Sequence, residues 1–302
     1  MTFSPALTER LLAAGLDLDD TANVVRSALA EDLPWGPDVT TTATVDAEVE
    51  AAADLVSRAR GVVAGIPVAL AVMEAAGLPT ERCNVVVDDG APVAGGDVIA
   101  TLRAPLVRLL TVERTLLNLV THLSGVATAT AAWVAETAGT GCAVRDTRKT
   151  TPGLRRLEKY AVRCGGGLNH RMGLGDAALV KDNHVAAAGG VSAAVARVRA
   201  AAPGVPLEVE CDTVAQVAEA LGAGVDLILL DNMGLDDLRA SVALAAGRDV
   251  LLEASGGLTL GGARSVAATG VHFLAVGALT HSSPALDIGL DLRGSEGRPL
   301  AP

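Results

Sequence analysis

The stretch DLILLDN, residues 226–232, is a short apolar run that ends in an acid and an amide. Five similar runs lie between residues 142 and 279, separated by alanine-rich helical stretches. Strands that are apolar on both faces are typical of a parallel sheet covered by helices. We therefore predict a strand–helix repeat in which the other strands are CAVRDT (142–147), AALVKDN (177–183), PLEVECD (206–212), VLLEAS (250–255) and FLAVGAL (273–279).

Polar residues stand at or just past the end of successive runs. Both a (β/α) barrel and a doubly wound sheet accommodate such a repeat. A barrel places its active site along the whole carboxyl edge of the sheet, whereas a doubly wound sheet uses that edge only at a switch point. Polar or charged side chains after five of the runs therefore favour the barrel. They are Asp146, Lys181, Asp182, Glu210, Asp231, Asn232 and Glu253.

The first 120 residues have a different pattern, in which helices alternate with strands. Residues 85–102 predict a hairpin with its turn at Gly95-Gly96-Asp97, which resembles the hairpins of lipoyl-type folds. Residues 106–138 are helical in pattern. Ser124-Gly125 predicts a break between two helices in that segment.

The composition excludes several classes of function. The formal net charge of −11 argues against general binding to nucleic acid and against docking on anionic membranes. No apolar run approaches the length needed to span a bilayer, and the first residues lack the pattern of a signal peptide. The four cysteines show no CxxC pairing, which favours reduced thiols in a cytoplasmic protein. A catalytic cysteine is not expected.

A basic cluster stands out in this acidic chain, and nine of its 24 Lys and Arg residues fall between Arg145 and Lys181. Crowded positive charges are unfavourable unless anions relieve them, and arginine suits carboxylates and phosphates. Arg148, Lys149 and Lys181 follow strands, so we predict that they contact a ligand. For Arg155, Arg156 and Lys159 we predict a solvated helix face.

The acids Glu210 and Asp231 end two successive runs. Facing carboxylates at a barrel mouth suit Mg²⁺ beside substrate phosphates. Ribose hydroxyls, or hydrogen bonds that only support the loops, are alternatives that the pattern leaves open. Glu208 and Asp212 share the face of Glu210 and complicate the choice.

Glycine-rich segments follow the last two strands. Ser255-Gly256-Gly257 and Val276-Gly277-Ala278 predict a cradle of backbone N–H groups for a phosphate. A third segment, Gly165-Gly166-Gly167, precedes His170 and Arg171. This loop either lets those two residues reach the site or serves only as a connector.

At this point the sequence resembles a known family. The segment RDTRKTTPGLRRLEKYAVRCGGGLNHRMGLGDAALVKDNH (145–184) is similar to the signature of the quinolinate phosphoribosyltransferases. Further blocks resemble the family in order over nearly the whole chain. They are EDLPWGPDVTT (31–41), RTLLNLVTHLSGVATAT (114–130), LEVECD (207–212), LILLDNM (227–233), EASGGL (253–258) and GVHFLAVGALTHS (270–282).

The resemblance implies a fold and a reaction. The fold is an N-terminal α/β sandwich, residues 1–120, with the tail 285–302 packed on it, and an open seven-stranded α/β barrel, residues 121–284. The reaction is a pentosyl transfer in de novo NAD synthesis: quinolinate and 5-phosphoribosyl 1-pyrophosphate give nicotinate mononucleotide, pyrophosphate and CO₂, with Mg²⁺. Family members form at least a homodimer, and Arg114 matches an arginine supplied to the neighbouring site.

The resemblance also implies roles for individual residues. Arg148, His170, Arg171 and Lys181 are expected around the two quinolinate carboxylates, and Thr147 and Lys149 belong to the same substrate-binding turn as Arg148. Lys149 is expected to reach the pyrophosphate, Glu210 and Asp231 to hold the ribose hydroxyls and Mg²⁺, and residues 255–257 and 276–278 to hold the 5-phosphate. The expected catalytic residues are Lys149, Lys181, Glu210 and Asp231.

Two alternatives remain open. One is a related type II phosphoribosyltransferase-like enzyme of molybdate-transport operons. The other is a barrel that senses a phosphorylated metabolite without catalysis. The dense basic set favours a dicarboxylate substrate, and the combination of Lys149, Glu210 and Asp231 favours catalysis over sensing.

Overall fold

A computed structural model describes residues 1–293, which divide into two compact units. Each unit is discontinuous in sequence. The first contains residues 1–129, 151–166 and the described chain from 282 onward, and the second contains residues 130–150 and 167–281. Within residues 1–293, no helix combines the length and the apolar composition needed to cross a membrane.

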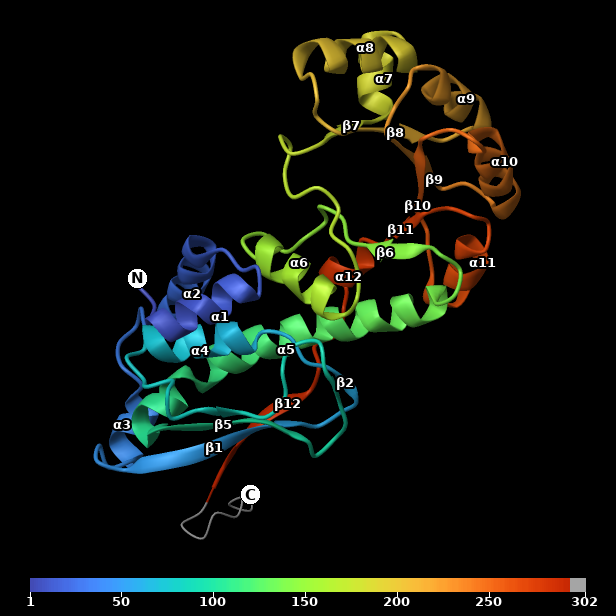
Figure 1. Ribbon diagram of the computed structural model, residues 1–302. Helices are drawn as coiled ribbons and strands as arrows, with labels where there is room; N and C mark the ends of the chain where they lie inside the picture. Colours follow the sequence, from blue (N-terminus) through green and yellow to red (C-terminus); the bar gives the residue numbers. More distant parts are fainter. Residues whose placement is uncertain (294–302) are drawn as a thin grey trace. The chain divides into compact units, whose positions relative to one another are not determined.

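The second unit is built on a six-stranded parallel sheet with the strand order β6-β11-β10-β9-β8-β7. In Figure 1 helices α8 to α11 line the outer side of this curved sheet. The strands are β6 (Ala143–Arg145), β7 (Ala178–Val180), β8 (Leu207–Cys211), β9 (Leu227–Asp231), β10 (Leu251–Ser255) and β11 (Phe273–Ala275). The helices are α7 (Asp182–Ala188), α8 (Val191–Ala201), α9 (Val214–Gly222), α10 (Leu235–Ala245), η1 (Leu260–Gly262), α11 (Ala263–Ala267) and α12 (Ala278–His281).

The six predicted strands are confirmed, and their register positions the polar residues that follow them. Ile228 and Leu230 of β9 are fully buried on one face and Leu229 is buried on the other, as expected for a strand covered on both faces. The pairs Ser255–Asp231 and Cys211–Leu230 lie opposite one another on neighbouring strands. Because all six strands are parallel, their carboxyl ends meet at one edge.

The predicted fold class, an α/β unit joined to an open α/β barrel, is confirmed, but the number of strands differs. The described part of the barrel sheet has six strands and one isolated bridge, in which Leu168 pairs with Arg145 over a single residue. The Asp146 carboxylate then accepts hydrogen bonds from the backbone N–H of His170, at 2.8 Å, and from the side chain of Asn169. Asn169 and His170 are thus held by a side chain rather than by further strand pairing.

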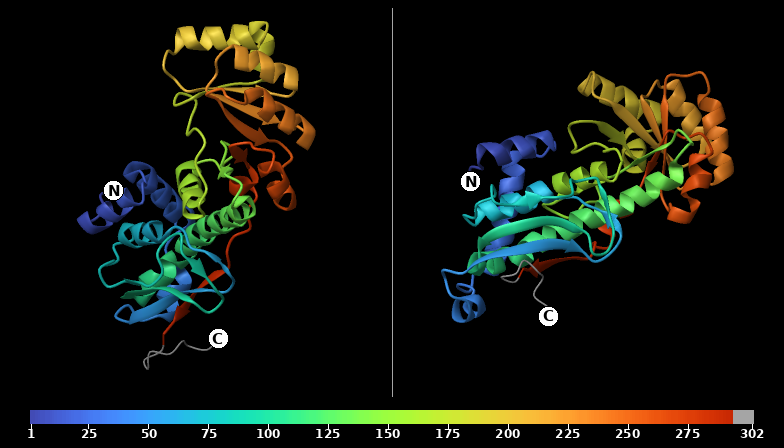
Figure 2. Two further views of the ribbon diagram at one scale, coloured as in Figure 1. Left: turned by 45° about the vertical axis from the view of Figure 1, so that its right-hand side comes forward. Right: turned by 60° about the horizontal axis from the view of Figure 1, so that its bottom comes forward.

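The first unit contains an antiparallel sheet with the order β12-β1-β5-β3 and a separate pair, β2-β4. Helices α4 and α5 lie along one face of the four-stranded sheet (Figure 2). The strands are β1 (Glu50–Ser57), β2 (Gly61–Val62), β3 (Asn84–Val85), β4 (Pro92–Val93), β5 (Val98–Pro105) and β12 (Ile288–Leu292). The helices are α1 (Pro5–Ala13), α2 (Leu18–Asp32), α3 (Val39–Thr44), α4 (Ile66–Ala75), α6 (Arg155–Cys164) and α5 (Leu106–Thr137), which continues into the second unit.

The predicted hairpin around Gly95-Gly96-Asp97 is only partly right. The turn is present, since Asp97 N–H donates to the Ala94 carbonyl and the Asp97 carboxylate accepts from Ala94 N–H. The flanking strands do not pair with each other, because β4 pairs with β2 and β5 pairs with β1 and β3.

The predicted helix break at Ser124-Gly125 is wrong, because α5 runs without interruption. The Ser124 hydroxyl donates to the Ala64 carbonyl and accepts from Ala64 N–H. Gly125 allows a close approach of the returning chain, and a Cβ there would lie 2.2 Å from the Pro284 carbonyl oxygen. These two residues therefore serve packing rather than a helix end.

The units also differ from the predicted boundary at residue 120. Residues 121–129 and helix α6 belong to the first unit, and the chain rejoins that unit at residue 282. Strand β12 pairs with β1 in antiparallel register. Of the tail that was expected to pack on this domain, residues 294–302 lie outside the described part of the chain.

The predicted solvated helix face on α6 is wrong for Lys159, which is fully buried. Arg156 is exposed and pairs with Asp17 at 2.9 Å. Glu158 is buried beside Lys159 and accepts a hydrogen bond from the Thr151 backbone N–H at 3.0 Å. Local charge density therefore did not distinguish the exposed side of this helix from its buried side.

The contact at Gly125 predicts a specific loss of stability. We expect Gly125→Ala to lower the free energy of unfolding by about 2 kcal/mol, because the added methyl group overpacks against Pro284. Gly222, the last residue of α9, has no neighbouring atom within 4 Å of the position that a Cβ would take, so Gly222→Ala is the matched control. Urea unfolding measures both, and equal stabilities would contradict the packing argument.

Candidate active site

A cavity of about 530 Å³ lies within the second unit, where the carboxyl ends of the strands meet. Nearly all the predicted substrate-binding residues line it, although their roles stay predictions. Those present are Thr147, Arg148, Lys149, His170, Arg171, Lys181, Glu210, Asp231, Ser255, Gly256, Gly257, Val276, Gly277 and Ala278. The remaining lining residues are Leu179, Leu229, Glu253, Leu258, Ala275 and His281.

The turn after β6 presents Arg148 and Lys149 to this cavity. Lys149 N–H donates to the Thr147 hydroxyl at 3.0 Å, and the Thr280 hydroxyl donates to the Lys149 carbonyl at 2.8 Å. A Cβ at Gly277 would lie 3.0 Å from the Lys149 side chain, so glycine lets the two loops approach closely. The threonine contacts thus fix the backbone of Lys149, and the glycine leaves room for its side chain.

Arg148 and Arg171 place two guanidinium groups on the same cavity. The Arg148 Nε is buried and has no hydrogen-bond partner among the described residues. Burial lowers the pKa of Arg171, and the positive charge of Arg148 lowers it further. Two like charges and a buried donor without an acceptor are costly unless an anion binds between them. The arrangement therefore favours a ligand with more than one negative charge.

The acidic residues sit at the ends of neighbouring strands. Glu210 is the fourth residue of β8 and pairs with the Lys181 ammonium, and Asp231 ends β9. Asn232 holds Asp231 by donating to its carboxylate at 2.6 Å. Each carboxylate keeps one oxygen that accepts no hydrogen bond from a described residue. Carboxylate oxygens are the ligands that Mg²⁺ prefers, so this pair fits the ion.

The glycine segments after β10 and β11 leave room for a ligand close to the backbone. Gly256 and Gly257 adopt left-handed φ angles of 82° and 58°, which favour glycine. A Cβ at Gly256 would lie 2.2 Å from the Asn232 side chain. Asn232 has a φ of 54°, and no other non-glycine residue within residues 1–293 has a positive φ. The two loops therefore lock together through Gly256 and Asn232.

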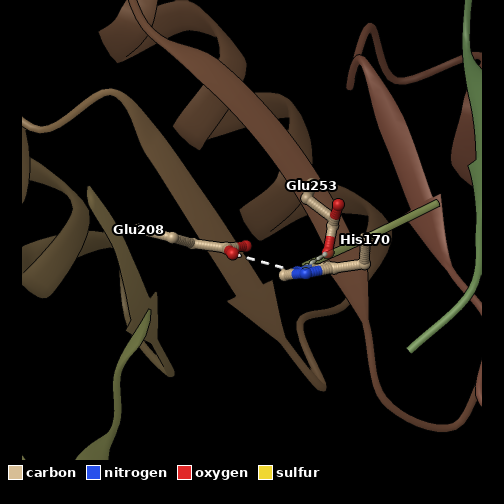
Figure 3. Close-up of side chains that lie close together, drawn as sticks. All are labelled: His170, Glu208 and Glu253. Atoms are coloured by element: carbon tan, nitrogen blue, oxygen red, sulfur yellow. Dashed lines mark ion pairs between the residues drawn. The ribbon is translucent and has the colours of Figure 1, made fainter. Parts of the chain in front are cut away.

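A buried cluster of ionisable side chains forms part of the cavity wall. His170 Nε2 is 3.0 Å from Glu208 Oε2 and 3.3 Å from Glu253 Oε1. Figure 3 shows the imidazole between the two carboxylates. The second oxygen of Glu253 accepts from the Arg145 guanidinium at 2.7 Å. Two cationic groups thus compensate two buried carboxylates.

The protonation of His170 follows from these neighbours. Burial alone lowers the pKa of His170, but the hydrogen bonds and charges of Glu208 and Glu253 raise it to about 9. The Arg171 backbone N–H points at Nδ1 at 2.7 Å, which favours a neutral ring with its proton on Nε2. Protonation of Nδ1 therefore requires this backbone contact to open. In either state Nε2 carries the proton that faces the carboxylates.

This cluster could also be considered as a metal site, because one ligand atom from each residue lies within 4.8 Å of the others. Two observations argue against a metal there. Nε2 carries a proton toward the carboxylates, so its lone pair is not free, and Arg145 already compensates Glu253. Burial raises the pKa of Glu208 and the charge of Glu253 raises it further, whereas the hydrogen bond from His170 lowers it.

Sequence reasoning missed several residues of the site. Glu253 was recognised only as a strand end, and His281 on α12 was not recognised at all, yet both line the cavity. Asn232 was recognised in the same way, but its left-handed turn, which asparagine tolerates well, was not predicted. Asp146 is buried and supports the His170 backbone instead of lining the cavity. Asp212 does not line it either.

Arg114 belongs to the first unit, on helix α5. Its side chain is exposed and makes no hydrogen bond or ion pair with another residue of the described chain. The neighbouring Glu113 is the charged group with which it interacts weakly. An exposed arginine without a fixed partner is available to a ligand or to another molecule.

The ionisation of His170 gives a testable dependence of stability on pH. Its pKa in the folded protein, about 9, exceeds the ordinary value of 6.5, so its contribution to stability is fully present below pH 6.5. That contribution is lost as the pH rises through 9. We expect the free energy of unfolding to fall between pH 6.5 and 9 and to fall less in His170→Gln. Identical slopes in urea unfolding would show that His170 does not titrate in this range.

Comparisons with known proteins agree with this geometry. The family models of the quinolinate phosphoribosyl transferase N-terminal and C-terminal domains match residues 38–124 and 126–291. The nicotinate-nucleotide pyrophosphorylase [carboxylating] of Mycobacterium leprae is 52% identical over 91% of this chain and 98% of its own length. The human protein of the same name is 38% identical over 92% of this chain and 94% of its own.

Solved structures show the same likeness. The nicotinate-nucleotide pyrophosphorylase of Ehrlichia chaffeensis superimposes with a TM-score of 0.85 at 36% identity, covering 90% of this chain and 98% of that one. The corresponding protein of Francisella tularensis gives a TM-score of 0.86 at 34% identity, covering 92% and 98%. Both domain models and the relatives together cover almost the whole described sequence. The chain belongs to the quinolinate phosphoribosyl transferase family.

Proposed function

We propose that the protein transfers the phosphoribosyl group of 5-phosphoribosyl 1-pyrophosphate to quinolinate and removes one carboxylate. The products are nicotinate mononucleotide, pyrophosphate and CO₂, and the reaction serves de novo NAD synthesis. The observation that carries the proposal is the pair of guanidinium groups, Arg148 and Arg171, facing one cavity with the buried Arg148 Nε left without an acceptor among the described residues. A pyridine dicarboxylate supplies two anionic groups to this pair.

The remaining lining residues divide the cavity between the two substrates. Arg148, Arg171 and Lys181 suit the carboxylates of quinolinate. The backbone N–H groups of residues 255–257 and 276–278 suit the 5-phosphate, and His281 stands beside Gly277, where its Nε2 would lie 3.3 Å from an added Cβ. Lys149 suits the pyrophosphate. The apolar lining residues Leu179, Leu229, Leu258 and Ala275 suit the ring and the sugar.

The chemistry can proceed by positioning and electrostatics without a covalent enzyme intermediate. The pyridine nitrogen attacks C1 of the ribose while pyrophosphate leaves, and positive charge develops on the sugar. Lys149 stabilises the negative charge on the leaving group. The new pyridinium nitrogen then accepts electron density as the carboxylate on C2 departs as CO₂. Arg148 and Arg171 hold the ring so that both steps occur in one position.

Mg²⁺ is part of the proposal. Glu210 and Asp231 would hold it, since each has a carboxylate oxygen that no described residue occupies, and both line the cavity. When bound, the ion would neutralise charge on the pyrophosphate. The same two carboxylates also suit the ribose hydroxyls. Lys181 competes for Glu210, so binding of the ion requires this ion pair to rearrange.

We further propose a cytoplasmic homodimer, or a higher oligomer, in which Arg114 serves the neighbouring site. The exposure of Arg114 and its lack of a fixed partner within the described chain support this assignment. The four cysteines are free thiols, which supports a reducing compartment. No nucleic acid or membrane partner is part of the proposal, in keeping with the net charge of −11.

Substrate choice tests the proposed reaction. We expect the protein to release CO₂ from quinolinate in the presence of 5-phosphoribosyl 1-pyrophosphate and Mg²⁺. Nicotinate should react with a kcat/KM about 100-fold lower, because the missing carboxylate leaves a buried guanidinium unpaired, at a cost of about 3 kcal/mol. A steady-state assay with both acids measures this. Equal or better turnover of nicotinate would overturn the proposal, and failure to release CO₂ from quinolinate would favour a sensor.

Subunit mixing tests the shared site. We expect Arg114→Ala and Lys181→Ala each to lose activity by about 100-fold, since each removes a charged contact to substrate. If the arginine acts on the neighbouring site, a mixed dimer contains one intact site. Random mixing should then restore about one quarter of the activity, because half the dimers are mixed and half their sites are intact. Absence of recovery in isolated mixed dimers would show that Arg114 acts within its own chain.

A further inference from the structure

Asp146 is a buried carboxylate that joins the two segments carrying Arg148 and Arg171. It is fully buried and does not line the substrate cavity. Its Oδ1 accepts a hydrogen bond from the His170 backbone N–H at 2.8 Å, and its Oδ2 accepts one from the Asn169 side chain at 2.5 Å. Arg148 follows Asp146 by two residues, and Arg171 follows His170 directly. One side chain therefore connects both segments, next to the residues that are proposed to bind substrate.

The backbone around this carboxylate is fixed by strand pairing. The carbonyl of Arg145, the last residue of β6, accepts from the Val276 backbone N–H at 2.9 Å. The Asp146 backbone N–H donates to the Leu168 carbonyl at 3.1 Å. The bridge between Leu168 and Arg145 is isolated, so the backbone ladder does not continue beyond it. The Asp146 carboxylate thus starts from a fixed backbone and holds residues 169 and 170, which the ladder does not reach.

The constraint passes from His170 to Arg171 through the imidazole. Figure 3 shows the ring between Glu208 and Glu253, whose oxygens lie 3.0 and 3.3 Å from Nε2. The other ring nitrogen, Nδ1, accepts from the Arg171 backbone N–H at 2.7 Å. The Arg171 guanidinium in turn donates to the Ala177 carbonyl at 3.0 Å. The position of Arg171 therefore depends on where the backbone and the ring of His170 are held.

The turn that carries Arg148 is also fixed close to Asp146. The Thr150 backbone N–H donates to the Arg148 carbonyl at 3.0 Å, and the Lys149 backbone N–H donates to the Thr147 hydroxyl at 3.0 Å. The buried Arg148 Nε has no hydrogen-bond partner among the described residues. A buried donor without an acceptor is costly, so a bound ligand has to bring its acceptor to a set position in this turn.

The proposed function gives this arrangement a role, and the present inference rests on that function. Quinolinate carries its two carboxylates on neighbouring ring carbons, so the groups that bind them must stand at one particular spacing. Nicotinate carries a single carboxylate and needs only one such group. A displacement of about 1 Å in the site can lower a rate about 100-fold. A shift of one arginine relative to the other would therefore cost the dicarboxylate much more than the monocarboxylate.

We propose that Asp146 sets the spacing of Arg148 and Arg171 and is thereby a positioning residue for the choice of a dicarboxylate. It acts on Arg148 through the backbone between them and on Arg171 through His170. The Asn169 amide and the His170 N–H are both donors toward it, and a carboxylate is the side-chain group that accepts at both of its oxygens. The residue type therefore matches the two contacts that the spacing requires.

The selectivity ratio, kcat/KM for quinolinate divided by kcat/KM for nicotinate, tests this role. Release of pyrophosphate measures both reactions. We expect Asp146→Ala to lower kcat/KM about 100-fold for quinolinate but only about 3-fold for nicotinate, so that the ratio falls from about 100 to about 3. A loss of folded protein would lower both values equally and leave the ratio unchanged. The ratio therefore separates positioning from a general loss of structure.

Two further variants grade the effect. Asn169→Ala removes one of the two hydrogen bonds to Asp146 and should lower the ratio about 5-fold. Asp146→Asn keeps an acceptor for the His170 N–H, and the Asn169 amide can turn to accept from the new amide group. This conservative variant should therefore retain most of the ratio.

Asp226→Ala is the matched control. Asp226 also accepts from a backbone N–H, that of Leu207 at 2.8 Å, but it precedes β9 and does not line the substrate cavity. Its loss should leave the ratio unchanged. An unchanged ratio in Asp146→Ala would overturn the proposal, as would an equal fall in Asp226→Ala. Where Asp146→Ala does not fold, an unchanged ratio in Asn169→Ala overturns it. Failure of the unaltered protein to prefer quinolinate would overturn the proposed function instead.

Discussion

Charge compensation inside the second unit is the interaction on which the site depends. Arg145 lies on β6, His170 precedes β7, Glu208 lies on β8 and Glu253 on β10. In the described sheet β6 and β7 are the outermost strands and do not pair with each other, so hydrogen bonds of the ladder do not close it. The ion pairs join these strands across the interior instead. Removing one partner would leave a buried charge uncompensated, at a cost of about 3–5 kcal/mol.

The same compensation explains how an acidic protein can bind polyanions. Net charge describes the surface as a whole, whereas a ligand responds to the groups within a few ångströms. Here Arg145 and His170 compensate Glu253 and Glu208, and Lys181 pairs with Glu210, so Arg148, Lys149 and Arg171 remain to face a ligand in the cavity. The backbone N–H groups of the glycine loops add positive potential without adding formal charge. The net charge therefore argued against nucleic acid and anionic membranes as partners, but it did not argue against a small anionic ligand.

Much of the second unit could be predicted because a single physical rule generates it. Apolar runs become parallel strands, and parallel strands bring their carboxyl ends together, so Lys181, Glu210 and Asp231 were predictable as neighbours. Contacts between segments distant in sequence were not predictable in this way. Lys159 is buried although its helix is rich in charge, and α5 continues through Gly125, where Pro284, far along the chain, lies close to the helix. Periodicity reports which face of an element is apolar, but not what lies against it.

The pairing of β12 with β1 has a consequence for the order in which the protein can form during synthesis. The first unit needs residues 288–292 to complete its sheet, and these follow every strand of the second unit in the sequence. The second unit needs no described residue beyond 281. A ribosome therefore exposes every strand of the second unit before it releases β12. The sheet of the first unit must wait with an open edge at β1, which makes the arrival of β12 the step that protects this edge from pairing with other chains.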